Sequence, residues 1–217
     1  MTTVLVLVPT LGREHLAFEA LAGRPLLEWA VTLAVQATGA SVIALVRPEF
    51  AAVIPPLSGD AALLFVDSSG VDDSTRARIA AADVVVVHDP LCPLVPAAFM
   101  SRLVHQLSQP SAGTRPASAL VAVRPVVDTL KQVDAAGLVA GTLDRETVRA
   151  VLSPVVATGQ RLADIPELTA ALTDPALLVR ALQANGDVQL VLAPESARRA
   201  NSRAALLSIS NSEDLPI

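Results

Sequence analysis

The sequence predicts an α/β fold: a Rossmann-like, mostly parallel sheet with helices on both faces and a projecting β-arm. Short apolar runs rich in β-branched residues alternate with segments of helical pattern, which is the order of a doubly wound sheet. Several runs are apolar throughout, as strands are when helices cover both faces. With 217 residues, 52% of them hydrophobic, the chain suits one core, so residues 1–217 are expected to form a single domain.

The apolar runs set the positions of the expected strands, and helices are expected between them. The strands are predicted at residues 4–8, 41–46, 62–66, 84–87, 118–123 and 188–192. The helices are predicted at residues 26–37, 74–82, 96–107, 161–172 and 175–184. Gly39 can end the first helix, Asp72 and Asp73 can cap the second, and Thr173 with Asp174 can cap the last. Ligands of such sheets bind outside the carboxyl ends of the strands, so the residues that follow each strand are the candidates for a site.

Residues 124–149 interrupt this alternation. They carry only weak strand signals on either side of residues 134–137, which predicts a hairpin arm that projects from the sheet. A lone hairpin cannot bury its apolar side chains in its own domain, so residues 124–149 are expected to be a dimerisation arm. Residues 109–116, rich in Ser, Pro and Gly, predict a surface loop.

Composition excludes several classes of function. The net charge of −5 and the lack of a basic run argue against binding to nucleic acid or to an anionic membrane surface. The apolar runs are far shorter than the ~20 residues of a membrane helix. A single cysteine, Cys92, and the lack of a secretory leader pattern favour the reducing cytoplasm. Aromatic residues make up only 2%, so a bound nucleotide would be held mainly by backbone groups.

Asp89 is the strongest single candidate for a functional residue. It follows the buried run 84–87 directly, where a carboxylate can meet a metal ion or a sugar hydroxyl. The alternative interpretation is an aspartate that caps the turn beside Pro90.

Short motifs in order along nearly the whole chain favour the functional interpretation of Asp89. The first is the strand 4–8 with Pro9, followed by the segment 17–29, which contains Gly-Arg-Pro-Leu-Leu-Glu-Trp. The further motif residues are His88, Asp89, Pro93, Pro125, Asp128, Thr129, Lys131, Thr142, Asp144, Arg145, Leu152, Pro154, Thr173, Asp174 and the segment 209–215. Together they resemble the 2-C-methyl-D-erythritol 4-phosphate cytidylyltransferase family, whose fold is that of the nucleotide-diphospho-sugar transferases.

The resemblance implies ligands, an assembly and a set of site residues. The ligands would be CTP and a sugar phosphate, with Mg²⁺ where nucleotide is bound, and the assembly a homodimer through the arm. Catalytic roles would fall on Arg13, Asp89, Thr129 and Arg145, and nucleotide binding on Pro9, Gly12 and Ser69. Asp89 would also be the metal ligand. For Arg145 the alternative is a solvated or dimer-interface charge.

The departures from the family pattern cluster at the expected chemistry. The long Gly-rich loop of the family is reduced to residues 11–16, and Leu16 stands where that loop has a lysine. Cys92 stands where the family has an arginine, and Ser208 where it has a second lysine. Because cations stabilise the charge of a reacting triphosphate, the sequence predicts a diverged relative whose CTP-dependent transfer is weak or lost, in effect a pseudoenzyme.

Two alternatives remain open. One is an active cytidylyltransferase with a rearranged phosphate loop, in which Arg13, Arg24 or Arg203 replaces the lost cations. The other is a non-catalytic dimeric protein that binds a protein partner. Arg198 and Arg199, with Arg203, are expected on a solvated helix face, with an anion site as the alternative.

Overall fold

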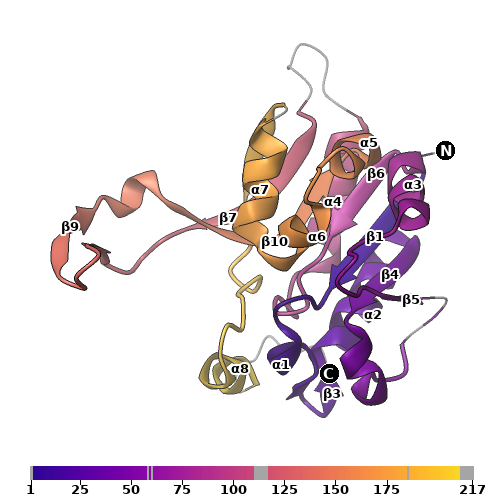
Figure 1. The fold of residues 1–217 in the computed structure, drawn as a ribbon, viewed down its shortest axis with the longest axis horizontal. Coiled ribbons are helices and arrows are strands. Elements are labelled where there is room, and N and C mark those ends of the chain that lie inside the picture. Colours follow the sequence, from indigo (N-terminus) through magenta and orange to yellow (C-terminus); the bar gives the residue numbers. More distant parts are fainter. Residues whose placement is uncertain (1, 58, 60, 110–116, 185, 211–217) are drawn as a thin grey trace.

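A computed structural model describes residues 2–57, 59, 61–109, 117–184 and 186–210. One seven-stranded sheet dominates this part of the chain, in the order β11-β7-β10-β6-β1-β4-β5 (Figure 1). Its strands are β1 (Val4–Pro9), β4 (Ser41–Val46), β5 (Ala62–Phe65), β6 (Val84–Val87), β7 (Ala119–Pro125), β10 (Arg149–Ala157) and β11 (Val188–Leu192). Strands β6, β1, β4 and β5 are mutually parallel, β11 is parallel to β7, and β10 is antiparallel to both its neighbours. The predicted mostly parallel sheet is therefore confirmed.

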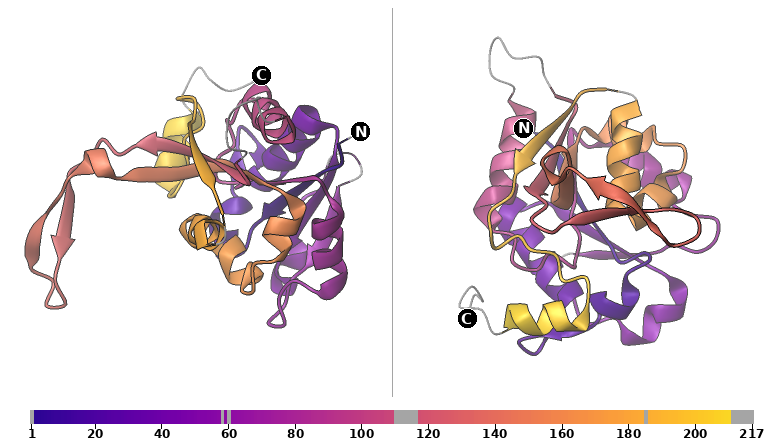
Figure 2. Two further views of the ribbon diagram at one scale, coloured as in Figure 1. Left: turned by 90° about the horizontal axis from the view of Figure 1, so that it is seen from above. Right: turned by 90° about the vertical axis from the view of Figure 1, so that its left-hand side faces the viewer.

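Helices cover both faces of the sheet, as the continuous apolar runs predict (Figure 2). The helices α2 (Leu26–Thr38) and α4 (Ala97–Ser108) pack on one face. The other face carries α3 (Asp73–Ala81), α5 (Gly159–Ala163), α6 (Leu168–Thr173) and α7 (Pro175–Ala184). Strand β6 shows the result: all four of its valines are buried, with Val85 and Val87 facing one helix layer and Val84 and Val86 the other. Burial on both faces is why its sequence does not alternate.

The short elements connect this frame. They are α1 (Glu14–Ala17), β2 (Ala20–Leu21), β3 (Arg24–Pro25), η1 (Pro48–Val53), β8 (Leu130–Val133), β9 (Val139–Leu143), η2 (Arg145–Thr147) and α8 (Arg203–Ser210). In the described ranges, no helix combines the length and the apolar character that crossing a membrane requires.

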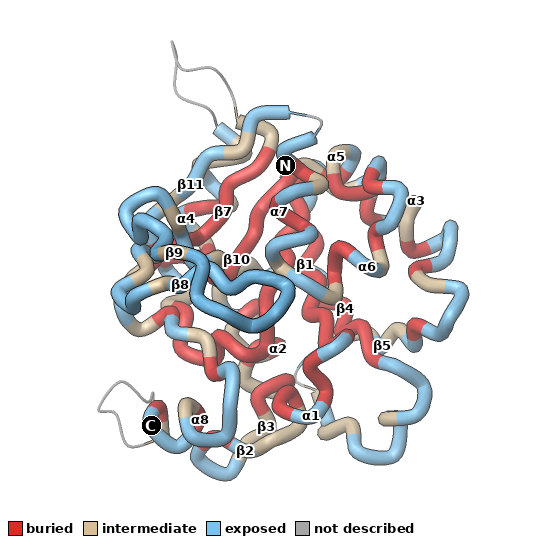
Figure 3. The backbone as a smooth tube through the Cα atoms, turned by 60° about the vertical axis from the view of Figure 1, so that its left-hand side comes forward, coloured by how far each residue is buried: buried red, intermediate tan, exposed pale blue. Residues whose placement is uncertain are grey.

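The predicted arm is present. The end of β7 and the start of β10 extend away from the sheet, and the hairpin β8–β9 stands at their tip (Figure 1). Its turn closes where the amide of Gly137 donates to the carbonyl of Asp134 at 3.0 Å. Most of the arm is exposed (Figure 3), including the apolar side chains of Val127, Leu138 and Val139, which are 65–76% accessible. The arm thus presents apolar surface that its own subunit leaves uncovered.

Three predictions about the elements need correction. Strand β10 is absent from the predicted strands, because Ser153-Pro154 breaks its pattern in sequence, yet it pairs with both β6 and β7. The expected helix 161–172 is split into α5 and α6, because Pro166 lacks an amide proton and disfavours helix at the residue before it. Arg198 and Arg199 precede α8 and lie on no helix. Residues 110–116 of the predicted surface loop, and most of the segment 209–215, lie outside the described residues.

Candidate active site

The loop after β1 is a tight turn that packs against α6. The amide of Arg13 donates to the carbonyl of Thr10 at 2.9 Å, and Gly12 has a φ of 76°. A Cβ atom at Gly12 would lie 2.6 Å from Cγ2 of Thr173, so both the backbone angle and the close approach favour glycine. Because this turn is held against α6, its backbone does not form an open cradle for a phosphate chain.

Arg13 is fixed inside the protein. Its side chain is 4% exposed, and its Nη1 atom lies 3.1 Å from Oδ1 of Asp89. Its Nη2 atom donates to the carbonyl oxygens of Leu172 at 2.8 Å and Thr173 at 2.7 Å. Arg13 therefore joins the β1 loop, the end of β6 and the end of α6 from within.

Asp89 lies between two arginines. Oδ1 faces Arg13 and also accepts the amide of Leu91 at 2.9 Å, while Oδ2 accepts from Nε of Arg199 at 2.8 Å. Burial raises the pKa of Asp89, but the charges of Arg13 and Arg199 and these hydrogen bonds outweigh it, so the pKa is lowered. Asp89 is consequently ionised, and its charge is compensated inside the fold.

His88, which precedes Asp89 in the chain, and Ser153, on the neighbouring strand β10, support Asp89. Nδ1 of His88 lies 2.6 Å from Oγ of Ser153, and the same Oγ accepts the amide of Asp89 at 3.0 Å. Burial lowers the pKa of His88 to about 4, although the charge of Asp89 opposes this shift. His88 is therefore neutral at pH 7 and connects the strands without adding charge.

Arg199, for which the sequence left an anion site as the alternative to a solvated helix face, lies beside Asp89. The amide of Ala200 donates to the carbonyl of Leu91 at 2.7 Å, which brings the segment before α8 to Asp89. The side chain of Arg199 is 29% exposed, and its bond to Asp89 uses Nε alone. Within the described ranges, neither Nη atom of Arg199 has a hydrogen-bond partner. No local signal could predict its contact with Asp89, because 110 positions separate the two residues.

The other candidate cations are engaged elsewhere. Arg24 lies over the ring of Trp29 at 4.5 Å and binds Glu28 at 3.1 Å and Thr32 at 3.0 Å. Arg203 pairs with Glu19. Neither contacts Asp89.

The three positions that lack the family's cations are also placed by the structure. Leu16 and Cys92 are buried, and Ser208 is exposed on α8. Burial raises the pKa of the Cys92 thiol, so that the thiol stays protonated and unreactive at pH 7. None of these side chains supplies charge to the site.

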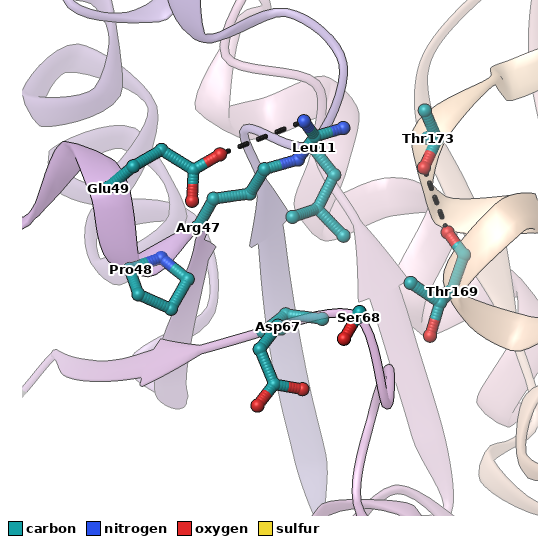
Figure 4. Close-up of a pocket in the computed structure, with 9 residues that line it drawn as sticks. Leu11, Arg47, Pro48, Glu49, Asp67, Ser68, Thr169 and Thr173 are labelled. Atoms are coloured by element: carbon teal, nitrogen blue, oxygen red, sulfur yellow. Dashed lines mark hydrogen bonds and ion pairs between the residues drawn. The ribbon is translucent and has the colours of Figure 1, made fainter.

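A cleft of about 490 Å³ opens at the carboxyl ends of β1, β4 and β5 (Figure 4). It is lined by Leu11, Arg47, Pro48, Glu49, Val66, Asp67, Ser68, Thr169 and Thr173. The position is the one expected for a ligand of a doubly wound sheet. Its lining charges are one arginine and two acids, and Arg47 lies 3.2 Å from Glu14 and 3.9 Å from Glu49. The cleft therefore has room for a nucleoside but little positive charge for a triphosphate.

The predicted site residues are only partly brought together. Arg13 and Asp89 meet, whereas Thr129 and Arg145 lie on the arm, where Nη1 of Arg145 donates to the carbonyl of Val127 at 2.7 Å. Pro9 ends β1 and Gly12 lies in the turn beside the cleft. Ser69 does not line the cleft; its hydroxyl and amide bind Asp67 at 2.6 and 2.8 Å, and Ser68 lines the cleft instead.

The arrangement at Asp89 does not fit a Mg²⁺ ion. Oδ1 accepts two donors, Oδ2 accepts a third, and two guanidinium groups place positive charge on both sides of the carboxylate. In the part of the chain that the structure describes, no three His, Cys, Asp or Glu side chains are grouped as metal ligands. Mg²⁺ binds proteins through one or two carboxylates, with water and phosphate oxygens completing its shell, and both oxygens of Asp89 already face donors of the protein.

Comparison with known proteins gives a consistent result. Residues 12–207 match the family model described as 2-C-methyl-D-erythritol 4-phosphate cytidylyltransferase. The cytidylyltransferase of this name from Nocardia farcinica is 36% identical over 200 residues, covering 83% of this chain and 81% of that protein. The one from Frankia casuarinae is 34% identical over 197 residues, covering 82% and 70%.

Solved structures agree on the fold. The 2-C-methyl-D-erythritol 4-phosphate cytidylyltransferase from Thermus thermophilus is 24% identical, with a TM-score of 0.69 and coverage of 97% of this chain and 98% of that one. A 4-diphosphocytidyl-2C-methyl-D-erythritol synthase structure is 18% identical, with a TM-score of 0.72 and coverage of 97% and 98%. At these identities the likeness establishes the fold alone.

The contacts of Arg13 predict that it stabilises the fold. Arg13→Met should lower the free energy of unfolding by about 3–5 kcal/mol, because it leaves the buried Asp89 with one partner fewer and two carbonyls without a donor. Urea denaturation measures this difference. The control is Arg203→Gln, which removes one member of an exposed pair and is expected to change stability by less than about 1 kcal/mol. An Arg13→Met protein as stable as this control would contradict a structural role.

His88 predicts a pH dependence of stability. Its pKa is about 4 in the folded protein, against an ordinary value of 6.5, so the unfolded chain binds an extra proton between these two values. The contribution of neutral His88 to the free energy of unfolding is complete above pH 6.5, and about 3 kcal/mol of it is lost as the pH falls to 4. Near pH 4 the lowered pKa of Asp89 adds a further loss of stability. Urea denaturation from pH 7 to 4 should show this slope in the wild type and in His105→Gln, an exposed control. His88→Asn should flatten it; an unchanged slope would refute the assignment.

Proposed function

The chain belongs to the 2-C-methyl-D-erythritol 4-phosphate cytidylyltransferase family, and on this basis we propose that it is a diverged member whose CTP-dependent transfer is weak or lost. The observation that carries the proposal is the position of Arg13. Both its Nη atoms are bound to groups of the protein itself, and its side chain is 4% exposed. The one arginine of the shortened loop is therefore unavailable to a triphosphate.

The surroundings support the same conclusion. Nucleotidyl transfer needs positive groups where negative charge develops on the phosphates, and one missing donor of this kind costs about 3 kcal/mol. Positions 16 and 92 are buried and apolar, and position 208 is an exposed serine. The cleft at β1, β4 and β5 is large enough for the nucleoside of CTP. The charged residues that line it are two acids and one arginine that is already paired.

An active enzyme with a rearranged phosphate site is the second candidate, because one observation favours it. Arg199 reaches Asp89 from the segment before α8, and its Nη atoms are without partners in the described ranges. Of the replacements considered from the sequence, Arg24 and Arg203 are already paired with acids. Turnover in this chain would therefore depend on Arg199.

Assembly through the arm is the third part of the proposal. The exposed valines and leucine of the arm are apolar surface that an exchange of arms between two subunits about a twofold axis would bury. Such an exchange would also carry each Thr129 and Arg145 toward the Asp89 of the other subunit. If the cleft proves to bind no nucleotide, the same surface favours a non-catalytic dimer that binds a protein partner.

Cytidylyl transfer tests the main proposal. Transfer from CTP to 2-C-methyl-D-erythritol 4-phosphate, measured by pyrophosphate release, should stay at background because the loop arginine is held inside and two cation positions are apolar. The relative from Nocardia farcinica serves as the matched control in the same assay. Turnover of about 1 per second, ordinary for an enzyme, would reject the proposal in favour of an active enzyme. Loss of that turnover in Arg199→Gln would then identify the replacement cation.

Light scattering tests the arm. The wild type at micromolar concentration should show twice the monomer mass of 22.4 kDa, because the arms cover each other's apolar side chains. Val127→Asp combined with Val139→Asp should return it to the monomer mass without loss of helical signal in circular dichroism. Leu207→Asp, an exposed apolar position on α8, is the matched control and should leave the dimer intact. A monomeric wild type would disprove arm exchange.

A further inference from the structure

The guanidinium of Arg199 is bound through only one of its three nitrogen atoms. Nε is bound to Asp89 at 2.8 Å, and Asp89 is itself fixed by Arg13 and by the amide of Leu91. The two Nη atoms form the other edge of the same planar group, and in the described ranges they have no hydrogen-bond partner. Two parallel N–H donors on one edge match the oxygen spacing of a phosphate group.

Arg199 also lies where a ligand can reach it. Asp89 follows β6 at the carboxyl end of the sheet, and 29% of the Arg199 side chain is exposed there. The connection to the cleft runs through Arg13, which binds the carbonyl of Thr173, a residue that lines the cleft. By contrast, Arg13 itself has no donor edge directed to solvent, since its Nη atoms bind internal acceptors and its side chain is buried.

Charge at this point favours an anion over a metal ion. Two guanidinium groups face the single carboxylate of Asp89, so the three side chains together carry one positive charge. The carboxylate oxygens that a divalent cation would need already accept three hydrogen bonds or ion pairs. A phosphate group would instead meet the net positive charge of these three side chains.

We propose that Arg199 forms a metal-independent binding site for a phosphate group, with Asp89 and Arg13 holding its guanidinium in position. The phosphate oxygens accept from the two Nη atoms, and the contact of Nε with Asp89 is kept. This proposal goes beyond the proposed function and holds whether or not any transfer activity remains.

Asp174 offers a second substitution that tests this site. Burial lowers the pKa of Arg199, but the charge of Asp89 and, less strongly, that of Asp174 outweigh burial, so the pKa is raised. Asp174 therefore lies close enough for its charge to act on Arg199. Asp174 is exposed, and its Oδ1 accepts the amide of Ala176 at 2.8 Å at the start of α7. Asparagine keeps that acceptor and removes the charge. Asp174→Asn should therefore strengthen phosphate binding without weakening the helix.

Pyrophosphate binding by isothermal titration calorimetry, in EDTA and at constant ionic strength, is the experiment. The wild type should bind pyrophosphate without metal, and Arg199→Gln should weaken binding at least about tenfold, the loss expected for a charged, paired donor. Arg199→Lys should fall between them, because lysine keeps the charge and loses the paired donors. Asp174→Asn should bind pyrophosphate at least about twofold more tightly than the wild type, because it removes a negative charge that repels the ligand. Arg180→Gln, an exposed position on α7, is the matched control and should bind as the wild type does.

Each outcome decides the proposal. Wild-type binding that appears only when Mg²⁺ replaces EDTA would overturn it, and so would the absence of binding in EDTA. Equal affinities of the wild type and a folded Arg199→Gln would place the anion elsewhere. If circular dichroism shows Arg199→Gln to be unfolded, Asp174→Asn decides, because unchanged affinity there would overturn the site. The transfer assay is independent of this binding experiment. Background turnover together with metal-free pyrophosphate binding supports both the loss of transfer and the phosphate site at Arg199. Turnover without metal-free binding rejects both.

Discussion

The ion pairs of Asp89 with Arg13 and Arg199 join the ends of two neighbouring strands to the segment before α8. Asp89 follows β6, Arg13 comes from the loop after β1, and Arg199 precedes α8. Removing one partner would leave buried charge uncompensated, which is costly at low dielectric. The turn after β1, the end of α6 and the approach to α8 therefore take their positions from one carboxylate.

Under the proposed loss of transfer, this constraint accounts for a nucleotidyltransferase fold whose loop arginine no longer binds phosphate. A long loop can leave its arginine free to meet a ligand. The short turn at Gly12 packs on Thr173 instead and directs Arg13 toward internal carbonyls. The same side chain that would serve chemistry at the end of a flexible loop thus serves stability when the loop is short. Of the two arginines at Asp89, Arg199 is bound through Nε alone and is partly exposed, and among the described residues its Nη atoms have no partner.

The two ends of the proposed site differ in character. The cleft at β1, β4 and β5 offers hydroxyl groups, apolar floor residues and a paired arginine, which suit an uncharged sugar and base more than phosphates. The region of Asp89 offers positive charge but little volume. The arm contributes to neither within one subunit, since Arg145 is bound to its own Val127. In the proposed dimer, a complete site would combine the cleft, Arg199 and the arm of the second copy.

The sequence alone determined the frame. Apolar β-branched runs, helix caps such as Asp72 and the turn at Gly137 act over a few residues, so their positions and those of Asp89 and the arm could be predicted. Strand β10 could not be predicted, because Ser153-Pro154 interrupts its strand pattern and pairing with a strand on each side stabilises it. Nor could the pairing of Arg199 with Asp89 be predicted, although the sequence left an anion site at Arg198, Arg199 and Arg203 as an alternative. Only the tertiary structure decided which of the arginines are buried, paired or open to a ligand, because that depends on charges and packing brought together from distant positions.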